Sequence, residues 1–349
     1  MNTPHKTLVI RFSSIGDIIL STPLLRVLRE RFPQGQIDYV TRTEYAGLVR
    51  HNANLNVTHE FDAATGFPGL RELKKKLRRE RYDLVIDLHN SIRSRYLRSM
   101  LGVGSIVKVD KRIKERTLLV KFKKNTYKSA TPVADRYIET VHEFGIQKDG
   151  KGPELYIPDE ILFGVSGKIA KLHLNQYDHV VGICPFAKHA TKEWPVERFV
   201  ELGVNAVKDL NCAVMIFGGT QERGRSELFV QALSGSIGGE RIFNFTGELS
   251  LVETAAAMQY CDAIVCNDSG LMHVATAMEK KVVAIFGPTV EEFGFFPQGG
   301  HSVVLERKGL YCRPCSHLGL PHCPEGHFRC MKDIGVGDAY SALRGMVKN

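Results

Sequence analysis

Asp17 is an acidic residue in the loop Ser-Ser-Ile-Gly-Asp at 13–17, between an apolar run at 7–12 and a helical pattern at 17–32. The apolar run predicts a buried strand, and the loop lacks the glycines of a dinucleotide-binding fingerprint. A carboxylate after such a strand can accept the proton of a substrate hydroxyl. It can also merely favour the helix N-terminus, whose dipole would lower the pKa of the carboxyl group and weaken it as a base. Asp17 is therefore a candidate catalytic residue, and both interpretations stay open.

Several loops in the second half of the chain combine Gly, Ser and Thr with cationic side chains. Each follows a predicted strand, and they span 185–195, 217–222, 245–250 and 267–273. Such loops suit an anionic ligand that is held by backbone N–H groups and helix N-termini. In the first loop, Lys192 can neutralise a diphosphate as negative charge grows on it.

The segment Asn-Asp-Ser-Gly-Leu-Met-His at 267–273 is the most informative of these loops. Ser269 and Gly270 lie at the start of a predicted helix, where free N–H groups and the dipole favour a phosphate. The same residues can serve as an N-cap and a cap-proximal glycine without any ligand, with His273 as a packing residue. Glu222, at another helix start, can accept hydrogen bonds from ribose hydroxyls or only complement the helix dipole.

Four cysteines near the C-terminus have the spacing C-x2-C-x7-C-x6-C. They are Cys312, Cys315, Cys323 and Cys330. The first pair has zinc-ligand spacing, which predicts a structural zinc site, although the second gap differs from that of a paired knuckle. Free thiols that brace a loop are the alternative. The remaining four cysteines lie in or beside apolar elements and are interpreted as core residues.

These loops require an alternating α/β framework to position them. Apolar runs and helical patterns alternate along the first half, and a second alternating series begins at 179–184. This order predicts two doubly wound parallel sheets, with ligands at the carboxyl ends of the strands. We expect an N-terminal domain at 1–165, a second domain at 175–330, and a C-terminal helix within 331–349 that packs back across the domains.

Composition and charge narrow the class of protein. The 349 residues include 43% hydrophobic and 24% charged residues, which is typical of a folded globular protein. The net charge of +9 is uneven, because residues 71–128 hold 19 Lys+Arg and 6 Asp+Glu, a local excess of +13. Such a region attracts nucleic acid, an anionic membrane surface or an anionic substrate, or is only a solvated basic face. Neither a signal peptide nor a membrane-spanning segment is recognised, so we expect a cytoplasmic protein.

Three segments taken together resemble glycosyltransferase family 9, the lipopolysaccharide heptosyltransferases. They are RFSSIGDIILSTPLLRVLRERFP, TKEWP and NDSGLMHVATA…VVAIFGPT. The resemblance implies a GT-B fold, with two Rossmann-like doubly wound domains facing a central cleft. It also implies an inverting transfer from ADP-L-glycero-D-manno-heptose to the lipopolysaccharide inner core, onto heptose or Kdo on lipid A, with no metal required for catalysis.

The resemblance also implies roles for individual residues. Asp17 matches the family's proposed catalytic base, and Lys192 matches a lysine that contacts phosphate. The residues assigned to donor binding are Lys192, Thr191, Glu222, Asp268, Ser269, Gly270 and His273. The residues assigned to the acceptor are Ser13, Ser14, Gly16, Asn90, Arg93 and Arg95, and Arg98 is expected to face the cleft with the last two.

The resemblance also suggests a partner for the basic region at 71–128. Lipid A bearing Kdo carries phosphates and carboxylates and lies in a membrane leaflet, so we expect transient association with the inner face of the inner membrane. Two alternatives remain. One is a GT-B enzyme that acts on another nucleotide sugar, and the other is a basic nucleic-acid-binding protein with a zinc module.

Overall fold

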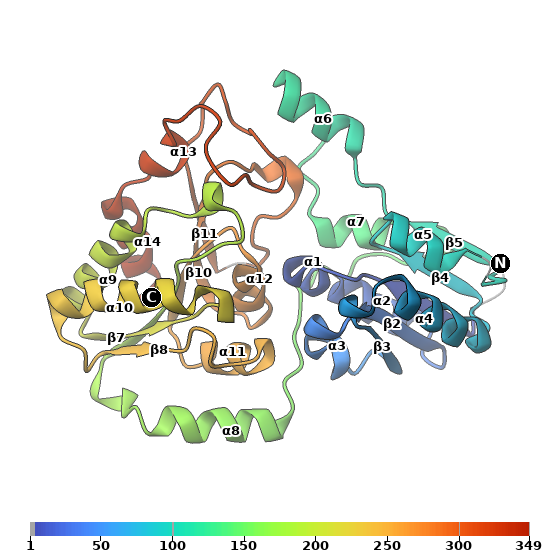
Figure 1. Cartoon of the computed structure of the whole chain (residues 1–349), viewed down its shortest axis with the longest axis horizontal. Coiled ribbons are helices and arrows are strands. Elements are labelled where there is room, and N and C mark those ends of the chain that lie inside the picture. Colours follow the sequence, from blue (N-terminus) through green and yellow to red (C-terminus); the bar gives the residue numbers. More distant parts are fainter. Residues whose placement is uncertain (1–3, 100, 300, 349) are drawn as a thin grey trace. The chain divides into compact units, whose positions relative to one another are not determined.

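The computed structural model describes residues 4–99, 101–299 and 301–348 and divides the chain into two compact units. The first unit contains the chain up to Ile113 and the segment Thr131–Tyr156. The second contains Lys114–Ala130 and the chain from Ile157 onward. Each unit has one parallel sheet with helices packed on it (Figure 1). Among the described residues, no helix has both the length and the apolar character needed to cross a membrane.

The first unit has a five-stranded parallel sheet in the order β3-β2-β1-β4-β5. Its strands are β1 (Lys6–Ile10), β2 (Gln36–Arg42), β3 (Val57–Phe61), β4 (Leu84–Asp87) and β5 (Ser105–Lys108). Its α-helices are α1 (Ile15–Ile19), α2 (Thr22–Arg31), α3 (Gly47–Arg50), α4 (Gly66–Glu80), α5 (Ile92–Arg98) and α7 (Val133–Glu139). The central strand β1 is almost wholly buried, so the loop that follows it is fixed by the core.

Helix α4 shows how sequence pattern sets the layers. Leu70, Leu73 and Leu77 recur at helical spacing, and they are buried in one cluster with Leu8 and Ile10 of β1. This stripe fastens α4 to the sheet, and the charged positions of the helix are left on its outer side. The first predicted helix, 17–32, is in fact two helices. Pro23, in the first turn of α2, has no N–H for a continuous helical ladder.

The second unit has a six-stranded parallel sheet in the order β11-β10-β9-β6-β7-β8. Its strands are β6 (His179–Cys184), β7 (Cys212–Ile216), β8 (Ile242–Asn244), β9 (Ala263–Asn267), β10 (Lys281–Phe286) and β11 (Ser302–Glu306). Its α-helices are α8 (Asp159–Ala170), α9 (Val196–Leu210), α10 (Arg223–Ile237), α11 (Leu251–Met258), α12 (Gly270–Ala277), α13 (Arg329–Lys332) and α14 (Val336–Lys348). The second unit also contains α6 (Ile113–Phe122) from Lys114 onward. The prediction of two doubly wound parallel sheets is confirmed.

The units differ from the domain boundaries expected from sequence. The second unit takes up the chain from Ile157, whereas the expected first domain ran to 165 and the second began at 175, because α8 packs against α11. The segment Lys114–Ala130 also belongs to the second unit, where Lys123 Nζ donates to the carbonyl oxygens of Cys312 (3.0 Å) and Pro314 (2.6 Å). The C-terminal helix α14 packs within the second unit, in the same core cluster as α9.

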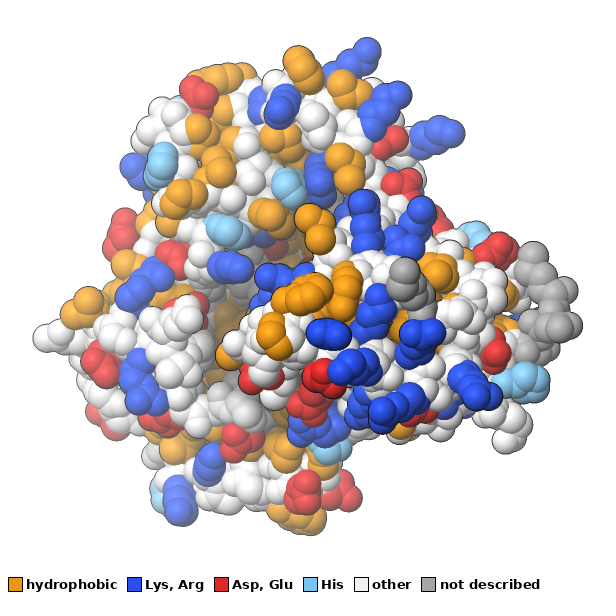
Figure 2. Space-filling view, turned by 45° about the vertical axis from the view of Figure 1, so that its right-hand side comes forward, with side chains coloured by type: hydrophobic (Ala, Val, Ile, Leu, Met, Phe, Trp, Pro, Cys, Tyr) orange, Lys and Arg blue, Asp and Glu red, His pale blue; other side chains and the backbone are white. Residues whose placement is uncertain are grey.

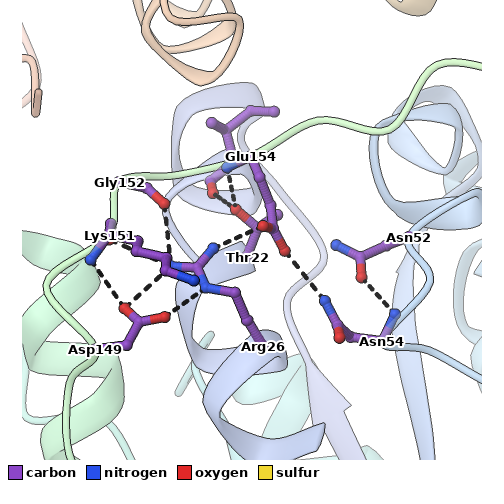
Figure 3. A network of polar contacts seen from close by, with 9 residues as sticks. Thr22, Arg26, Asn52, Asn54, Asp149, Lys151, Gly152 and Glu154 are labelled. Atoms are coloured by element: carbon purple, nitrogen blue, oxygen red, sulfur yellow. Dashed lines mark hydrogen bonds and ion pairs between the residues drawn. The ribbon is translucent and has the colours of Figure 1, made fainter. Parts of the chain in front are cut away.

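Arg26 of α2 fastens the last segment of the first unit (Figure 3). Its guanidinium donates to both oxygens of Asp149, from Nε at 2.5 Å and from Nη2 at 3.1 Å, and Nη1 donates to Glu154 Oε2 at 2.7 Å. Glu154 is held further by Asn54 Nδ2 at 3.1 Å and through its own N–H, which donates to Thr22 Oγ1 at 2.9 Å. The bidentate geometry suits Arg and not Lys, because only the guanidinium is a planar fork of donors.

Replacement of Arg26 by Met is expected to lower the free energy of unfolding by about 2 kcal/mol. The variant leaves Asp149 and Glu154 without their cation, and breaking a fully buried ion pair costs roughly 3–5 kcal/mol. We expect less here because the two carboxylate side chains keep 13% and 24% exposure to water. Urea unfolding of the full chain measures the effect, and a loss below about 0.5 kcal/mol would show that the network is not stabilising.

Candidate active site

Asp17 lies at the carboxyl end of β1, in the first turn of α1. Ser14 is the N-cap of this helix, and its backbone N–H donates to Asp17 Oδ2 at 3.2 Å. The Ser14 hydroxyl donates to the same oxygen at 2.8 Å. The capping interaction considered from sequence is therefore present. Gly16 is buried inside the helix, whereas Ser14 is exposed.

The other carboxylate oxygen of Asp17 is held by two residues outside the loop. Arg11 Nη2 lies 2.6 Å from Asp17 Oδ1, and the Tyr137 hydroxyl donates to that oxygen at 3.1 Å. Burial disfavours the charged carboxylate, but the charge of Arg11 and the hydrogen bonds from Ser14 outweigh it and hold the pKa of Asp17 below its usual value. Asp17 is consequently an oriented, ionised carboxylate whose side chain is 15% exposed.

His89 follows β4 and packs edge-on against Phe12, with ring centroids 5.4 Å apart. Burial and the nearby charges of Arg11 and Lys111 lower the pKa of His89 to about 3. The imidazole is therefore neutral at physiological pH and adds no charge beside Asp17.

This shift predicts that His89 destabilises the fold as the medium becomes acidic. Between pH 6.5 and about 3 the unfolded imidazole binds a proton and the folded one does not, so the free energy of unfolding falls as the pH drops below 6.5. Between pH 7 and 5.5 the loss from this group should reach about 1 kcal/mol. Urea unfolding of the wild type and of His89→Gln at both pH values isolates the contribution. An equal pH dependence in the two proteins would contradict the prediction.

The acceptor residues predicted after β4 lie in two different environments. Asp87 Oδ1 accepts hydrogen bonds from the backbone N–H groups of His89 (3.0 Å) and Asn90 (2.7 Å), which fixes the loop. Asn90 Oδ1 is buried and has no partner among the described residues, whereas Arg93 and Arg95 are exposed on α5. Arg98 does not join them, because its Nε lies 3.0 Å from the buried Asp87 Oδ2.

In the second unit, Lys192 and Asp268 form an ion pair. Lys192 Nζ lies 2.7 Å from Asp268 Oδ2, which also accepts a hydrogen bond from Thr289 Oγ1 at 2.7 Å. Both partners are shielded, since the Lys192 side chain is 15% and the Asp268 side chain 5% exposed. The structure thus brings together two residues that lie far apart in the sequence and that were both predicted to bind the donor.

The N-terminus of α12 follows Asp268 directly. Ser269 is the N-cap in extended conformation, and Gly270 is the first helical residue. The Ser269 hydroxyl oxygen is buried and forms no hydrogen bond with any described residue. The site therefore offers an ammonium group, a hydroxyl and helix N–H groups, which is the donor set that a phosphate binds. His273 lies one turn later, buried, and packs edge-on against Phe295.

Two further donor predictions have structural partners of their own. The Thr191 hydroxyl donates to the Leu320 carbonyl oxygen at 3.1 Å and accepts from the Leu320 N–H at 2.7 Å. Glu222 Oε2 accepts from the Gly219 N–H at 2.5 Å, and burial raises the pKa of Glu222. Their contacts with a donor remain predictions.

The four C-terminal cysteines line one small pocket. Cys312 Sγ lies 3.7 Å from His327 Nε2, and burial together with the neighbouring thiols raises the pKa of Cys330 to about 12. In the described part of the chain, however, no three His, Cys, Asp or Glu side chains are arranged so that they could hold a metal ion. The side-chain positions thus do not support the predicted structural zinc, which stays a prediction for metal analysis of the purified protein.

Sequence reasoning did not find the residues that orient these carboxylates. Arg11 lies in the same motif as Asp17, but its place in the strand predicted at 7–12 suggested only a strand residue, and in the structure it follows β1. Tyr137 lies 120 residues further along the chain, and no local pattern linked it to Asp17. Thr289 follows β10 and carried no recognisable signal. These contacts depend on the strand order, which local pattern does not encode.

The geometry defines a class of protein. Two Rossmann-like domains, one with an oriented carboxylate and the other with a phosphate-binding arrangement, are what a GT-B glycosyltransferase requires. The family model for glycosyltransferase family 9 (heptosyltransferase) matches residues 70–320. The chain belongs to glycosyltransferase family 9, and it is accordingly a heptosyl-transferring enzyme.

Individual relatives agree with this assignment. Lipopolysaccharide heptosyltransferase 2 of Escherichia coli K12 is 28% identical over 303 residues, covering 82% of this chain and 84% of its own. The structure resembles a glycosyltransferase family 9 protein from Veillonella parvula, with a TM-score of 0.82, 22% identity and coverage of 100% and 99%. It also resembles E. coli heptosyltransferase WaaC with ADP-2-deoxy-2-fluoro heptose, with a TM-score of 0.69, 17% identity and coverage of 97% and 99%.

Proposed function

We propose that this enzyme transfers a heptose from ADP-L-glycero-D-manno-heptose to the inner core of lipopolysaccharide, onto heptose or Kdo attached to lipid A. Family membership supports heptosyl transfer, and the names of the relatives support the acceptor class. The observation that carries the mechanism is the Asp17 carboxylate, held ionised by Arg11 at the carboxyl end of β1.

The donor diphosphate is proposed to bind beside α12. Lys192 Nζ, the Ser269 hydroxyl and the N–H of Gly270 supply positive charge and hydrogen-bond donors at this place. As the bond from the anomeric carbon to the phosphate oxygen breaks, negative charge grows on the departing ADP, and these groups stabilise it. They supply the positive charge that the leaving group needs, so the proposal assigns no metal to this step.

Asp17 is proposed to act as the general base. The acceptor hydroxyl attacks the anomeric carbon opposite the departing ADP, which inverts the configuration, and the hydroxyl proton passes to the carboxylate. Four donor contacts already reach the two oxygens of Asp17. Ser14 is exposed and its hydroxyl rotates freely, so we infer that the acceptor hydroxyl replaces the contact from Ser14 Oγ.

A transfer assay tests the proposed substrates. Purified enzyme is incubated with ADP-heptose or with UDP-sugars, and with heptose-deficient lipopolysaccharides of stepped length as acceptors. The proposal expects product only from ADP-heptose, only with an inner-core acceptor, and unchanged after dialysis against EDTA. Transfer from a UDP-sugar with none from ADP-heptose would instead favour the alternative of another nucleotide sugar.

The acceptor is anchored in a membrane leaflet, so we also propose reversible, peripheral association with the inner face of the inner membrane. The support is the local excess of +13 within residues 71–128.

A further inference from the structure

Two exposed apolar side chains of the first unit lie at the beginnings of neighbouring helices. Phe67, near the start of α4, is 60% exposed, and Ile92, the first residue of α5, is 85% exposed. The Phe67 ring meets the ring of Tyr96 at a centroid distance of 4.7 Å, and Tyr96 lies one turn after Ile92. The three side chains thus form an apolar group that spans α4 and α5, which pack against each other (Figure 1).

Cations of α4 continue from this apolar group along one side of the helix. Arg71, Lys74 and Arg78 follow Phe67 at intervals of four, seven and eleven residues, which places all four on one helical face. Lys74 Nζ lies 4.2 Å from the centre of the Tyr96 ring and donates to Ser99 Oγ at 2.8 Å. Arg71 and Arg78 are exposed.

Acidic residues do not neutralise this face. The two acids of α4 are Glu72 and Glu80, and each already has a cationic partner. Glu72 pairs with Lys75 at 2.7 Å, and Glu80 pairs with Lys6 at 2.5 Å. Figure 2, in which this side of the molecule is turned forward, shows Lys and Arg side chains gathered with hydrophobic side chains beside them.

The apolar group lies at the same edge of the sheet as Asp17. Phe67 follows β3 and Ile92 follows β4, and Asp17 follows β1. These strands are parallel, so all three residues lie at the carboxyl edge of one sheet. A membrane in contact with this edge would present its embedded molecules beside the proposed base.

We propose that the α4–α5 surface, made of Phe67, Arg71, Lys74, Arg78, Ile92 and Tyr96, docks onto an anionic lipid membrane. The cations approach lipid phosphates, and Phe67 and Ile92 enter the interfacial region. This inference deepens the proposed membrane association, which named no surface. A nucleic acid also binds cations, but an aliphatic side chain as exposed as Ile92 has no partner on a phosphate backbone. Lipid is therefore the occupant that this combination fits.

Vesicle sedimentation of the full chain tests the proposal. We expect binding to phosphatidylcholine vesicles that contain phosphatidylglycerol, little binding to pure phosphatidylcholine, and release as salt rises. Arg71→Gln combined with Arg78→Gln should weaken binding about 30-fold. Ile92→Ser should weaken it about 5-fold and leave the salt dependence unchanged, because it removes apolar contact alone.

Matched substitutions elsewhere control for charge and hydrophobicity. Lys171→Gln with Lys208→Gln removes two exposed cations, and Phe163→Ser removes an apolar side chain that is 77% exposed. These controls should bind vesicles as the wild type does. Equal losses in the controls, or unchanged binding in the α4–α5 variants, would overturn the proposal. Tight binding of single-stranded RNA without vesicle binding would overturn it in favour of a nucleic-acid partner.

Activity separates this inference from the proposed function. The α4–α5 variants should lose transfer to an acceptor embedded in vesicles and keep transfer to a deacylated, water-soluble core oligosaccharide. Equal loss on both acceptors with normal vesicle binding would refute docking. If no heptosyl transfer is found at all, sedimentation still decides whether this surface binds lipid.

Discussion

Replacement of Asp17 by Asn is expected to lower kcat for heptosyl transfer about 10³-fold, with KM for the donor nearly unchanged. An amide of the same shape cannot take the acceptor proton, and a positioned general base contributes about 10²–10⁴-fold. Donor binding is assigned to Lys192 and α12, in the other unit, so the donor's KM should not follow the loss in kcat.

The low pKa of Asp17 sets the pH range over which the wild-type enzyme should be active. The carboxylate is fully ionised at neutral pH, so protonation of Asp17 should not limit the wild-type rate until the pH falls below the usual pKa of an aspartate. A weak base can still serve, because the acceptor hydroxyl becomes strongly acidic only as its oxygen bonds to the anomeric carbon. We therefore expect the proton to be transferred late, with Arg11 keeping the carboxylate charged until then.

Tyr137→Phe provides the matched control for orientation. It removes one hydrogen bond to Asp17 Oδ1 and leaves the Arg11 contact in place. We expect a smaller loss, about 10-fold, and an acid limb of the rate profile that moves to higher pH, because the carboxylate loses a donor that favours its charged form. Thermal unfolding must show that Asp17→Asn stays folded, since Arg11 loses its partner there. A folded Asp17→Asn variant with near-normal kcat would remove Asp17 from the chemistry.

The central strands could be predicted from sequence because each is a run of buried apolar residues. The run predicted at 7–12 contains most of β1, and the run at 179–184 is β6. The edge strands β3 and β5 were missed, because neither has a continuous run of buried apolar residues: β3 mixes buried and exposed positions, and β5 alternates between half-buried and exposed ones. β11 lies at the edge of the second sheet and was also missed: it holds the short apolar run 303–305, but none of its residues is fully buried.

In the site, too, sequence pattern predicts where single residues lie but not which residues far apart in the chain contact each other. Asp17, Ser269 and Gly270 stand at helix starts after strands, so sequence pattern alone places them at the ligand edge. The pairing of Lys192 with Asp268 was not predictable, because it requires β6 and β9 to be neighbours in the sheet. Arg98 points to the buried Asp87 instead of to a ligand, since a buried carboxylate must find a cation or a hydrogen-bond donor.

Lys192→Gln is expected to lower kcat/KM for ADP-heptose about 10²–10³-fold. The ammonium group is paired to Asp268 directly before the N-terminus of α12, where the donor diphosphate is proposed to bind. Charge on the departing ADP is larger in the transition state than in the bound donor, so kcat should fall more than the affinity for ADP-heptose.

The substitution should leave the fold intact, which makes the loss interpretable. Asp268 loses its cation but keeps the hydrogen bond from Thr289 Oγ1 at 2.7 Å, and a glutamine amide can donate in place of the ammonium. We therefore expect the free energy of unfolding to fall by about 1–2 kcal/mol, less than the roughly 3–5 kcal/mol of a fully broken buried ion pair.

Lys188→Gln is the matched control, because Lys188 lies in the same loop and is exposed. It removes the same charge four residues away and should lower kcat/KM less than about 3-fold, the effect of a screened surface charge. If the two variants lose activity equally, general attraction of the anionic donor explains the loss. If Lys192→Gln alone loses it, and weakens binding of ADP-heptose less than it lowers kcat, the ammonium group acts on the leaving group as its bond breaks.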